Sequence, residues 1–193
     1  QFAPVEITPT FWIVPSWHAV PAQAERVIRL DPGQAFGTGT HPTTQMCLRW
    51  IARQAPAWAA RWKRVRDYGC GSGVLAIATV LHGARGVEAV DIDLAAVRAT
   101  HDNASANDVA LMAGLPEGAC GEYALVLANI LATPLTVLAP LLSAHVAPGG
   151  HLVLAGILSR QADALCTAYA PTLELDVADE QDGWILMTAQ RRA

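Results

Sequence analysis

Apolar residues along the chain gather in short runs that alternate with stretches of helical periodicity. Two runs are almost wholly apolar, ALVLANI at residues 124–130 and HLVLAGI at residues 151–157. This pattern is typical of parallel strands that helices cover on both faces. Two shorter runs, RVRDY at 64–68 and GVEAVDID at 86–93, predict further strands. We therefore expect a mostly parallel sheet.

Helical patterns separate these strands. The first begins at Pro42, a residue favoured in the first turn of a helix, and places Met46 and Trp50 at helical spacing. Asp93 stands where the N-cap of another helix belongs. The predicted helices cover residues 42–54, 74–83 with a closing Gly83, 94–107, and 133–146 before a turn at 148–150.

The two ends of the chain follow different patterns. Residues 11–15 and 25–30 predict short strands in an N-terminal lead-in. Residues 173–178 and 183–190 predict an antiparallel hairpin, because the short polar stretch between them cannot form a parallel crossover. The whole order predicts an open, doubly wound α/β sheet, and such sheets bind ligands beyond the carboxyl ends of their strands.

Composition narrows the class of protein. A chain of 193 residues with 52% hydrophobic content is long enough for one well-buried core. No unbroken apolar run reaches the ~18 residues of a membrane span, so no membrane association is expected. The formal charge of −4 gives no overall attraction to nucleic acid. One basic cluster, residues 61–66, is interpreted as a solvated approach to a strand.

Metal and disulfide chemistry are not indicated. The four cysteines, Cys47, Cys70, Cys120 and Cys166, lie far apart without a CxxC pair, which favours a reducing compartment. The six histidines are scattered without metal-ligand spacing, so we expect no metal site, and His41 is not expected to be a ligand.

Three features fall at carboxyl ends of predicted strands. The turn GCGSG at residues 69–73 follows the strand at 64–68, Asp91 lies near the end of the run at 86–93, and Asn129 lies near the end of the run at 124–130. Glycines at alternate positions let the backbone approach a ligand closely, although they also occur in purely structural turns. Asp91 comes 22 residues after Gly69, the interval at which a carboxylate can accept hydrogen bonds from ribose hydroxyls. Together these features indicate a ligand that contains a nucleoside.

Two other chemistries are disfavoured. A dehydrogenase fingerprint would read G-x-G-x-x-G, whereas here the third glycine comes one residue early. Ser72 lies in the glycine turn without the neighbours of a hydrolase nucleophile. The chemistry is therefore expected to depend on a cofactor.

The segments DYGCGSGVLAIA, AVDIDLAAV, LVLANILATPL and APGGHLVLAGIL resemble successive motifs of the class I S-adenosylmethionine-dependent methyltransferases. The segment LDPGQAFGTGTHPTTQMCL is similar to the signature of the PrmA-type ribosomal protein methyltransferases. The resemblance runs from about residue 11 to the last strand. It implies a Rossmann-like, doubly wound sheet of seven strands that is mostly parallel and ends in an antiparallel hairpin.

The resemblance also implies an activity. The cofactor would be S-adenosylmethionine, with S-adenosylhomocysteine as product. The reaction would be protein-lysine N-methylation, with ribosomal protein L-eleven (L11) as the substrate, at lysine side chains and the α-amine. We expect a cytoplasmic monomer that does not bind nucleic acid directly.

The domain boundaries follow from the same resemblance. Residues 1–30 are expected to be a lead-in with short strands, and residues 31–193 the S-adenosylmethionine-binding domain. Members of the family carry a linked N-terminal domain that recognises the ribosomal substrate. This chain is expected to lack that domain and to be the catalytic half.

The resemblance carries the cofactor contacts onto Thr44, Gly69, Asp91 and Asn129. We add Gly71 and Gly73 from the same turn, and Gly39 and Phe36 from the loop at residues 31–44, DPGQAFGTGTHPTT. Phe36 either covers the methionine chain, lines the path of the target amine or belongs to the core. The methionine carboxylate would meet the first turn of the helix that begins at Pro42, where N–H groups lack intrahelical partners, with Thr44 contacting it.

Asn129 is the candidate catalytic residue. We expect its side-chain carbonyl, with a nearby backbone carbonyl, to accept the N–H groups of the target amine and aim the lone pair at the methyl group. The competing interpretation is that Asn129 only caps the next helix or contacts the cofactor.

Three alternatives remain open from the sequence. The first is a class I methyltransferase acting on another amine, glutamine or RNA, which would lack the FGTGTHPTT stretch at residues 36–44. A nicotinamide dehydrogenase is the second, and a non-catalytic module that binds S-adenosylmethionine is the third.

Overall fold

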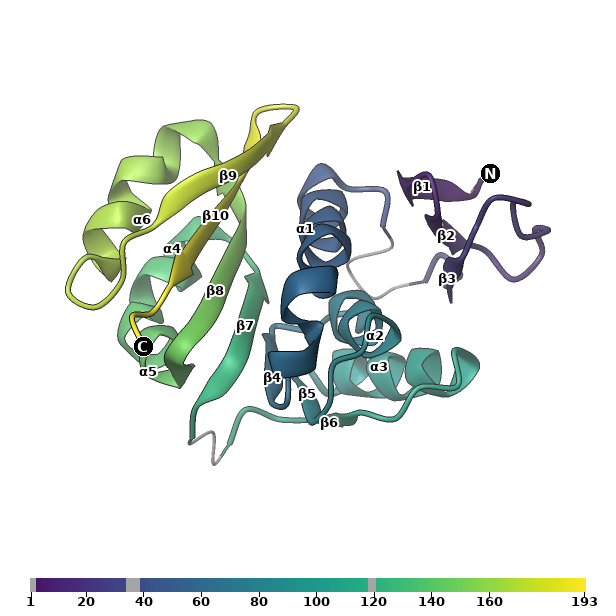
Figure 1. Ribbon diagram of the computed structural model, residues 1–193, viewed down its shortest axis with the longest axis horizontal. Coiled ribbons are helices and arrows are strands. Elements are labelled where there is room, and N and C mark those ends of the chain that lie inside the picture. Colours follow the sequence, from purple (N-terminus) through teal and green to yellow (C-terminus); the bar gives the residue numbers. More distant parts are fainter. Residues whose placement is uncertain (1–2, 34–38, 118–120) are drawn as a thin grey trace.

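The computed structural model describes residues 3–33, 39–117 and 121–193. Two sheets form its framework (Figure 1). The larger has seven strands in the order β6-β5-β4-β7-β8-β10-β9, and the smaller has three in the order β1-β2-β3. The strands of the larger sheet are β4 (Val65–Tyr68), β5 (Val87–Val90), β6 (Met112–Gly114), β7 (Tyr123–Asn129), β8 (Val146–Leu158), β9 (Asp176–Gln181) and β10 (Trp184–Gln190).

The larger sheet has the predicted pairing. Strands β4 to β8 pair in parallel, and β10 runs antiparallel to both β8 and β9. The expectation of a doubly wound, mostly parallel seven-stranded sheet with a terminal antiparallel hairpin is therefore confirmed. The carboxyl ends of the parallel strands lie along one edge of the sheet.

Helices cover both faces of the larger sheet, as Figure 1 shows. Along β7, Leu125 and Leu127 join the core cluster of one face, whereas Val126 and Ala128 join that of the other. This alternation is why the run looks continuously apolar in sequence. The helices α1 (Pro42–Trp58), α2 (Val74–Leu81) and α3 (Leu94–Ala106) lie on the first face, and α4 (Ala132–Val137), α5 (Ala139–His145) and α6 (Ala162–Tyr169) on the second.

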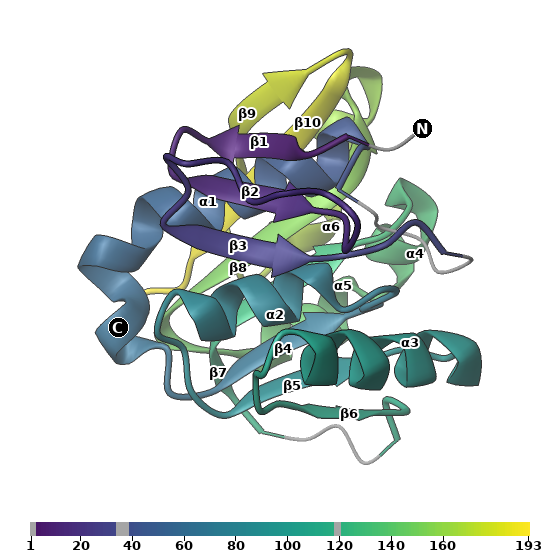
Figure 2. The ribbon, with the colours of Figure 1, turned by 90° about the vertical axis from the view of Figure 1, so that its right-hand side faces the viewer.

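The smaller sheet packs over α1 and α2, and its strands are β1 (Val5–Thr8), β2 (Phe11–Val14) and β3 (Arg26–Arg29) (Figure 2). The two strands predicted at residues 11–15 and 25–30 are confirmed as β2 and β3. Asn107, at the end of α3, joins the free edge of β3: its Oδ1 accepts from the Arg29 N–H at 2.7 Å and its Nδ2 donates to the Arg29 carbonyl at 2.9 Å. The asparagine side chain therefore replaces a neighbouring strand at this edge.

Two predicted elements were wrong in detail. The single helix expected over residues 133–146 is two helices that meet at Leu138, with Pro140 in the first turn of the second. Proline lacks the N–H that a continuous helix needs, so the chain starts a new helix there. The turn expected at residues 148–150 lies within β8, as an irregularity in its pairing with β7.

Among the described residues, no helix is long and apolar enough to cross a membrane. The same residues contain no group of three His, Cys, Asp or Glu side chains that could hold a metal ion.

Candidate functional site

The glycine turn between β4 and α2 has backbone angles that favour glycine. Gly69, Gly71 and Gly73 have φ values of +77°, +55° and +83°. The left-handed region costs other residues free energy because of their Cβ atoms. The turn is also tightly packed: a Cβ on Gly69 would lie 2.5 Å from Ile130 Cγ2, and one on Gly73 would lie 2.7 Å from Thr100 Cγ2.

Side chains of α3 hold the turn in place. Thr100 Oγ1 donates to the Gly71 carbonyl at 3.1 Å, and Asn103 Nδ2 donates to the Ser72 carbonyl at 2.7 Å. The N–H groups of Gly69 and Cys70 donate to the Val90 carbonyl at 2.8 and 2.9 Å. The ends of β4 and β5 are thereby fixed relative to each other.

Asp91 follows β5 directly beside the glycine turn. Its Oδ2 accepts from the Gly71 N–H at 3.0 Å, and its Oδ1 accepts from the Asp93 N–H at 3.0 Å. Asp93 itself is confirmed as the N-cap of α3, accepting from the Ala95 N–H at 2.9 Å. Two backbone N–H groups thus orient the Asp91 carboxylate, which is half-buried at the edge where the parallel strands end.

The structure brings Asn129 and Thr44 together. Asn129 is the last residue of β7, and Thr44 lies fully buried in the first turn of α1. Asn129 Nδ2 donates to Thr44 Oγ1 at 3.3 Å, across 85 positions of sequence. Because the amide nitrogen faces Thr44, the carbonyl oxygen Oδ1 is the atom of Asn129 that can accept a hydrogen bond from a ligand.

His41 has a structural role at the start of α1. As the N-cap residue, its Nδ1 accepts from the Thr43 N–H at 3.2 Å and lies 2.8 Å from Thr43 Oγ1. Its ring meets that of Trp184 edge to face, with centroids 5.0 Å apart. The sequence had suggested only that His41 is no metal ligand. Its capping position could have been inferred from Pro42, which often follows a cap.

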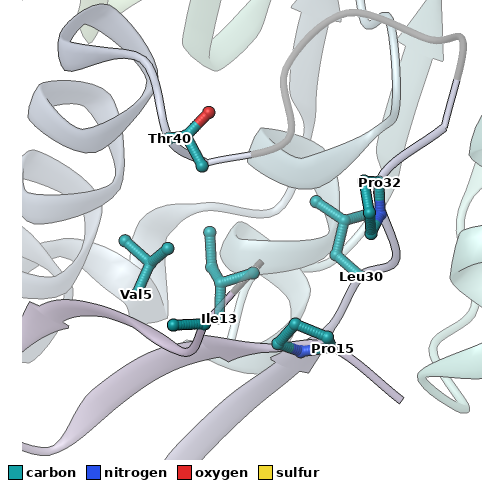
Figure 3. A pocket seen from close by; sticks show the side chains of 7 residues that line it. Val5, Ile13, Pro15, Leu30, Pro32 and Thr40 are labelled. Atoms are coloured by element: carbon teal, nitrogen blue, oxygen red, sulfur yellow. The ribbon is translucent and has the colours of Figure 1, made fainter. Parts of the chain in front are cut away.

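Gly39 lies in the short segment before α1, residues 39–41, which we call the opening segment. It is buried with φ +88°, and a Cβ there would lie 2.2 Å from Ile13 Cδ1, so the segment packs closely on the smaller sheet. Beside it is a hollow of about 10 Å³, which holds roughly one water. Figure 3 shows its lining, by Val5, Ile13, Pro15, Leu30, Pro32 and Thr40 among others. The hollow is too small for a nucleoside. Phe36 lies outside the described residues.

Asp67 is a buried carboxylate close to the glycine turn that sequence reasoning missed. It lies on β4 two positions before Gly69, with 1% of its surface exposed, and its Oδ2 has no hydrogen-bond partner in the described part of the chain. Burial raises the pKa of Asp67 to about 7, the Ala76 N–H lowers it, and the nearby Asp91 raises it further. The signal in the sequence is a carboxylate inside an otherwise buried strand.

Large apolar side chains are exposed next to Asp91. Ile92, the next residue, is 82% exposed, and Leu115, which follows β6 on the neighbouring strand, is 37% exposed. Asp91 N–H donates to the Gly114 carbonyl at 3.2 Å, so the ends of β5 and β6 lie together. These side chains offer an apolar surface beside a carboxylate, which the sequence pattern had not identified.

The strand order, the glycine turn after β4 and the carboxylate after β5 define a class I methyltransferase fold. Solved structures support this class. A 16S rRNA methyltransferase from T. thermophilus, in complex with AdoMet and guanosine, superimposes with a TM-score of 0.65 over 82% of this chain and 45% of that chain. Its sequence identity of 20% makes this a likeness of fold.

Residues 1–192 match the family described as Ribosomal protein L11 methyltransferase (PrmA), and the chain belongs to this family. The relative from Polaromonas sp. is 65% identical over 98% of this chain, and that from Bordetella parapertussis is 53% identical over 97%. Both are named Ribosomal protein L11 methyltransferase, and this chain spans 63% of the length of each. The crystal structure of ribosomal protein L11 methylase from Lactobacillus delbrueckii is 33% identical, with a TM-score of 0.88 over 100% of both chains.

Proposed function

We propose that this chain transfers methyl groups from S-adenosylmethionine to lysine side chains and the α-amine of ribosomal protein L11. The observation that carries this proposal is the hydrogen bond between Asn129 and Thr44. It joins the end of the fourth parallel strand to the first turn of α1. A residue suited to orient an amine therefore touches one suited to hold a cofactor. Membership of the family supports the choice of substrate.

The residues at the edge of the sheet fit S-adenosylmethionine chemically. The Asp91 carboxylate is oriented by two backbone N–H groups and can accept hydrogen bonds from two ribose hydroxyls. Ile92 and Leu115 offer an apolar surface to the purine. Gly69, Gly71 and Gly73 let the backbone approach the ligand.

The first turn of α1 fits the methionine end. N–H groups at a helix N-terminus attract a carboxylate. His41 accepts from one of them, the Thr43 N–H. A bound carboxylate would therefore accept from the other N–H groups of that turn. We propose that the backbone and side chain of Thr44 contact the methionine end of the cofactor, and that Gly39 lines the same part of the site. Phe36 retains the roles proposed for it from the sequence.

When bound, S-adenosylmethionine supplies a methyl group on a sulfonium: an N–C bond forms, the S–C bond breaks and its electron pair stays on sulfur. The protein positions the amine for this displacement. Asn129 Oδ1 accepts an N–H of the amine, while its Nδ2 is held by Thr44. The lone pair of the amine is thereby aimed at the methyl carbon.

The target amine must lose a proton first. The ordinary pKa of a lysine is ~10.4, so near neutrality its nitrogen carries no lone pair. A buried position beside a positive sulfonium lowers that pKa, because both effects disfavour the charged amine. Water at the open edge of the sheet can then remove the proton, and the reaction does not require a dedicated base.

We also infer the wider setting. Residues 1–30 lead into the S-adenosylmethionine-binding domain of residues 31–193. The family name supports a cytoplasmic location, because the substrate it names is a ribosomal protein. The formal charge of −4 supports a monomer that recognises a protein rather than nucleic acid.

Two measurements test the proposal. Calorimetry should show binding of S-adenosylmethionine and none of NAD. Mass spectrometry of L11, incubated with the full-length chain and S-adenosylmethionine, should show added methyl groups on lysines or the α-amine, with ribosomal RNA and glutamine side chains unmodified in parallel reactions. Binding without methylation of L11 would contradict the substrate alone, whereas absence of binding would contradict the whole proposal.

A further inference from the structure

The tip of the C-terminal hairpin contacts the start of α1. In Figures 1 and 2 the tip between β9 and β10 lies beside the beginning of this helix. Gln181, the last residue of β9, donates from Nε2 to Gln45 Oε1 at 2.8 Å. Gln45 in turn donates from its Nε2 to the carbonyls of Gly39 and Thr40, at 3.1 and 3.3 Å. A side-chain relay therefore connects the hairpin to the opening segment.

A guanidinium fixes the direction of this relay. Arg49, one turn further along α1, donates from Nη2 to Gln181 Oε1 at 2.5 Å and pairs with Asp179 at 3.3 Å. A guanidinium can only donate, so Gln181 must present its oxygen to Arg49 and its nitrogen to Gln45. Gln45 must then present its own nitrogen to the two carbonyls. The four hydrogen bonds therefore run in one direction. Arg49 donates to Gln181, Gln181 donates to Gln45, and Gln45 donates to the two carbonyls.

The relay acts next to the proposed transfer site. Gln45 is adjacent in sequence to Thr44, whose hydroxyl accepts from Asn129. On its other side, Gly39 packs against Ile13 of the smaller sheet. The peptide of Gly39 and Thr40 is therefore held from one side by the smaller sheet and from the other by the hairpin relay.

We propose that Gln45 and Gln181 are positioning residues for the methionine end of S-adenosylmethionine. This inference rests on the proposed function. A carbonyl oxygen that faced the N-terminus of α1 would repel a carboxylate bound there. By donating to the carbonyls of Gly39 and Thr40, Gln45 keeps both oxygens directed at its own amide. Gln181 and Arg49 keep that amide in the required orientation.

The expected effect is on cofactor affinity. A hydrogen bond of this kind contributes ~0.5–1.5 kcal/mol, and ~1.4 kcal/mol corresponds to a tenfold change in an equilibrium constant. We expect Gln45→Leu and Gln181→Leu each to raise the Kd for S-adenosylmethionine by about threefold to tenfold. The Kd of the double variant should be close to that of the single variant that binds more weakly, because both substitutions interrupt one relay. The KM for S-adenosylmethionine should rise while kcat stays near the parent value.

Gln45→Glu separates positioning from packing. The carboxylate has nearly the size of the amide but only accepts hydrogen bonds, so it cannot hold the two carbonyls. It should weaken cofactor binding at least as much as Gln45→Leu. Gln190→Leu is the matched control: Gln190 is exposed at the opposite end of β10, and its Nε2 donates to the Gly149 carbonyl at 3.3 Å. This variant should bind like the parent.

Calorimetry and thermal unfolding of each variant together test the inference. Weakened binding in the Gln45 and Gln181 variants, with parent-like binding in Gln190→Leu, supports it. A Kd unchanged within twofold in both Leu variants overturns it, whether or not the Tm falls. If Gln45→Leu does not fold, the Kd of Gln181→Leu alone tests the inference. A parent chain that binds no S-adenosylmethionine refutes the proposed function itself, and the inference with it.

Discussion

The fold brings two side chains that are far apart in the sequence, Asn129 and Thr44, into contact at the candidate site. Neither residue is reactive by itself, and each has a common structural use, at a strand end and in a helix. Their contact at 3.3 Å fixes which atom of the Asn129 amide faces the edge of the sheet. The proposed chemistry depends on this orientation more than on either residue type.

Replacing Asn129 should separate catalysis from binding. We expect Asn129→Ala to lower kcat by on the order of 10²-fold, because the amine loses the group that orients it. The Kd for S-adenosylmethionine should change little, since the contacts of Asp91 and the glycine turn remain. Methylation of L11 followed by mass spectrometry, with calorimetry alongside, measures both quantities. A variant that keeps full rate and full affinity would show that Asn129 does not orient the amine.

Asp67 should make stability depend on pH. The unfolded chain releases this proton near pH 3.8, whereas the folded protein holds it until about pH 7. Between these values the folded state binds more protons, so rising pH destabilises it. Asp67→Asn does not ionise, so its stability relative to the parent should increase from pH 5 to pH 8. One pKa unit corresponds to ~1.4 kcal/mol, so the increase should be about 3 kcal/mol.

Urea unfolding of both proteins at the two pH values measures this difference. A difference in the free energy of unfolding that is the same at pH 5 and pH 8 would show that Asp67 ionises normally. Taking the difference between variant and parent cancels the contributions of other titrating groups.

Sequence reasoning located some residues of the site better than others. The glycine turn, Asp91 and Asn129 stand at ends of strands that the apolar runs mark clearly, so their meeting at one edge followed from the parallel order. Whether they contact a cofactor is still a prediction. Gln45 and Gln181 gave no such signal, because glutamines on half-buried surfaces are common and only the folded chain shows that these two are partners.

Among the elements, β3 depends on a side chain for one of its edges. The Asn107 amide exchanges two hydrogen bonds with the Arg29 backbone. This contact joins the smaller sheet to the helix that also holds the glycine turn. The lead-in strands are thus connected to the glycine turn through α3.

Asn107→Ala should therefore loosen the smaller sheet. Leaving backbone groups of a partly buried strand without partners costs ~1–3 kcal/mol. We expect a loss of this size in the free energy of unfolding, measured by urea titration. Ser105→Ala, at an exposed position of the same helix, should change stability much less. Equal stability of the two variants would mean that water replaces the Asn107 amide without cost.

Elements were predicted best where apolar periodicity was long. Helix α1 begins at Pro42 as expected, and the C-terminal hairpin forms as predicted, although its first strand is Asp176–Gln181 and not residues 173–178. The three-residue strand β6 was not predicted, because its first residue, Met112, is 69% exposed and a run of three carries no period. Helix α6 was missed as well. The break at Leu138 escaped notice because its neighbours on both sides are apolar.

In the whole molecule, the order of strands places β4 and β7 at the centre of the larger sheet. The elements that carry the glycine turn and Asn129 are therefore the most enclosed, whereas the antiparallel hairpin forms an edge. Sequence alone indicated the class of fold because alternating strands and helices permit few topologies. The position of the smaller sheet could not be read from the sequence, since it depends on contacts between residues far apart in the chain, such as Arg29 with Asn107 at the end of α3.

The hairpin contact has a consequence for the making of the protein. Gln181 is synthesised 136 residues after Gln45. A growing chain can complete the glycine turn and Asn129 while its end is still inside the ribosome. The contact that holds Gly39 and Thr40 from the hairpin must wait until Gln181 has emerged as well. A chain interrupted before Gln181 would contain the glycine turn and Asn129 but would lack the hairpin contact to Gln45.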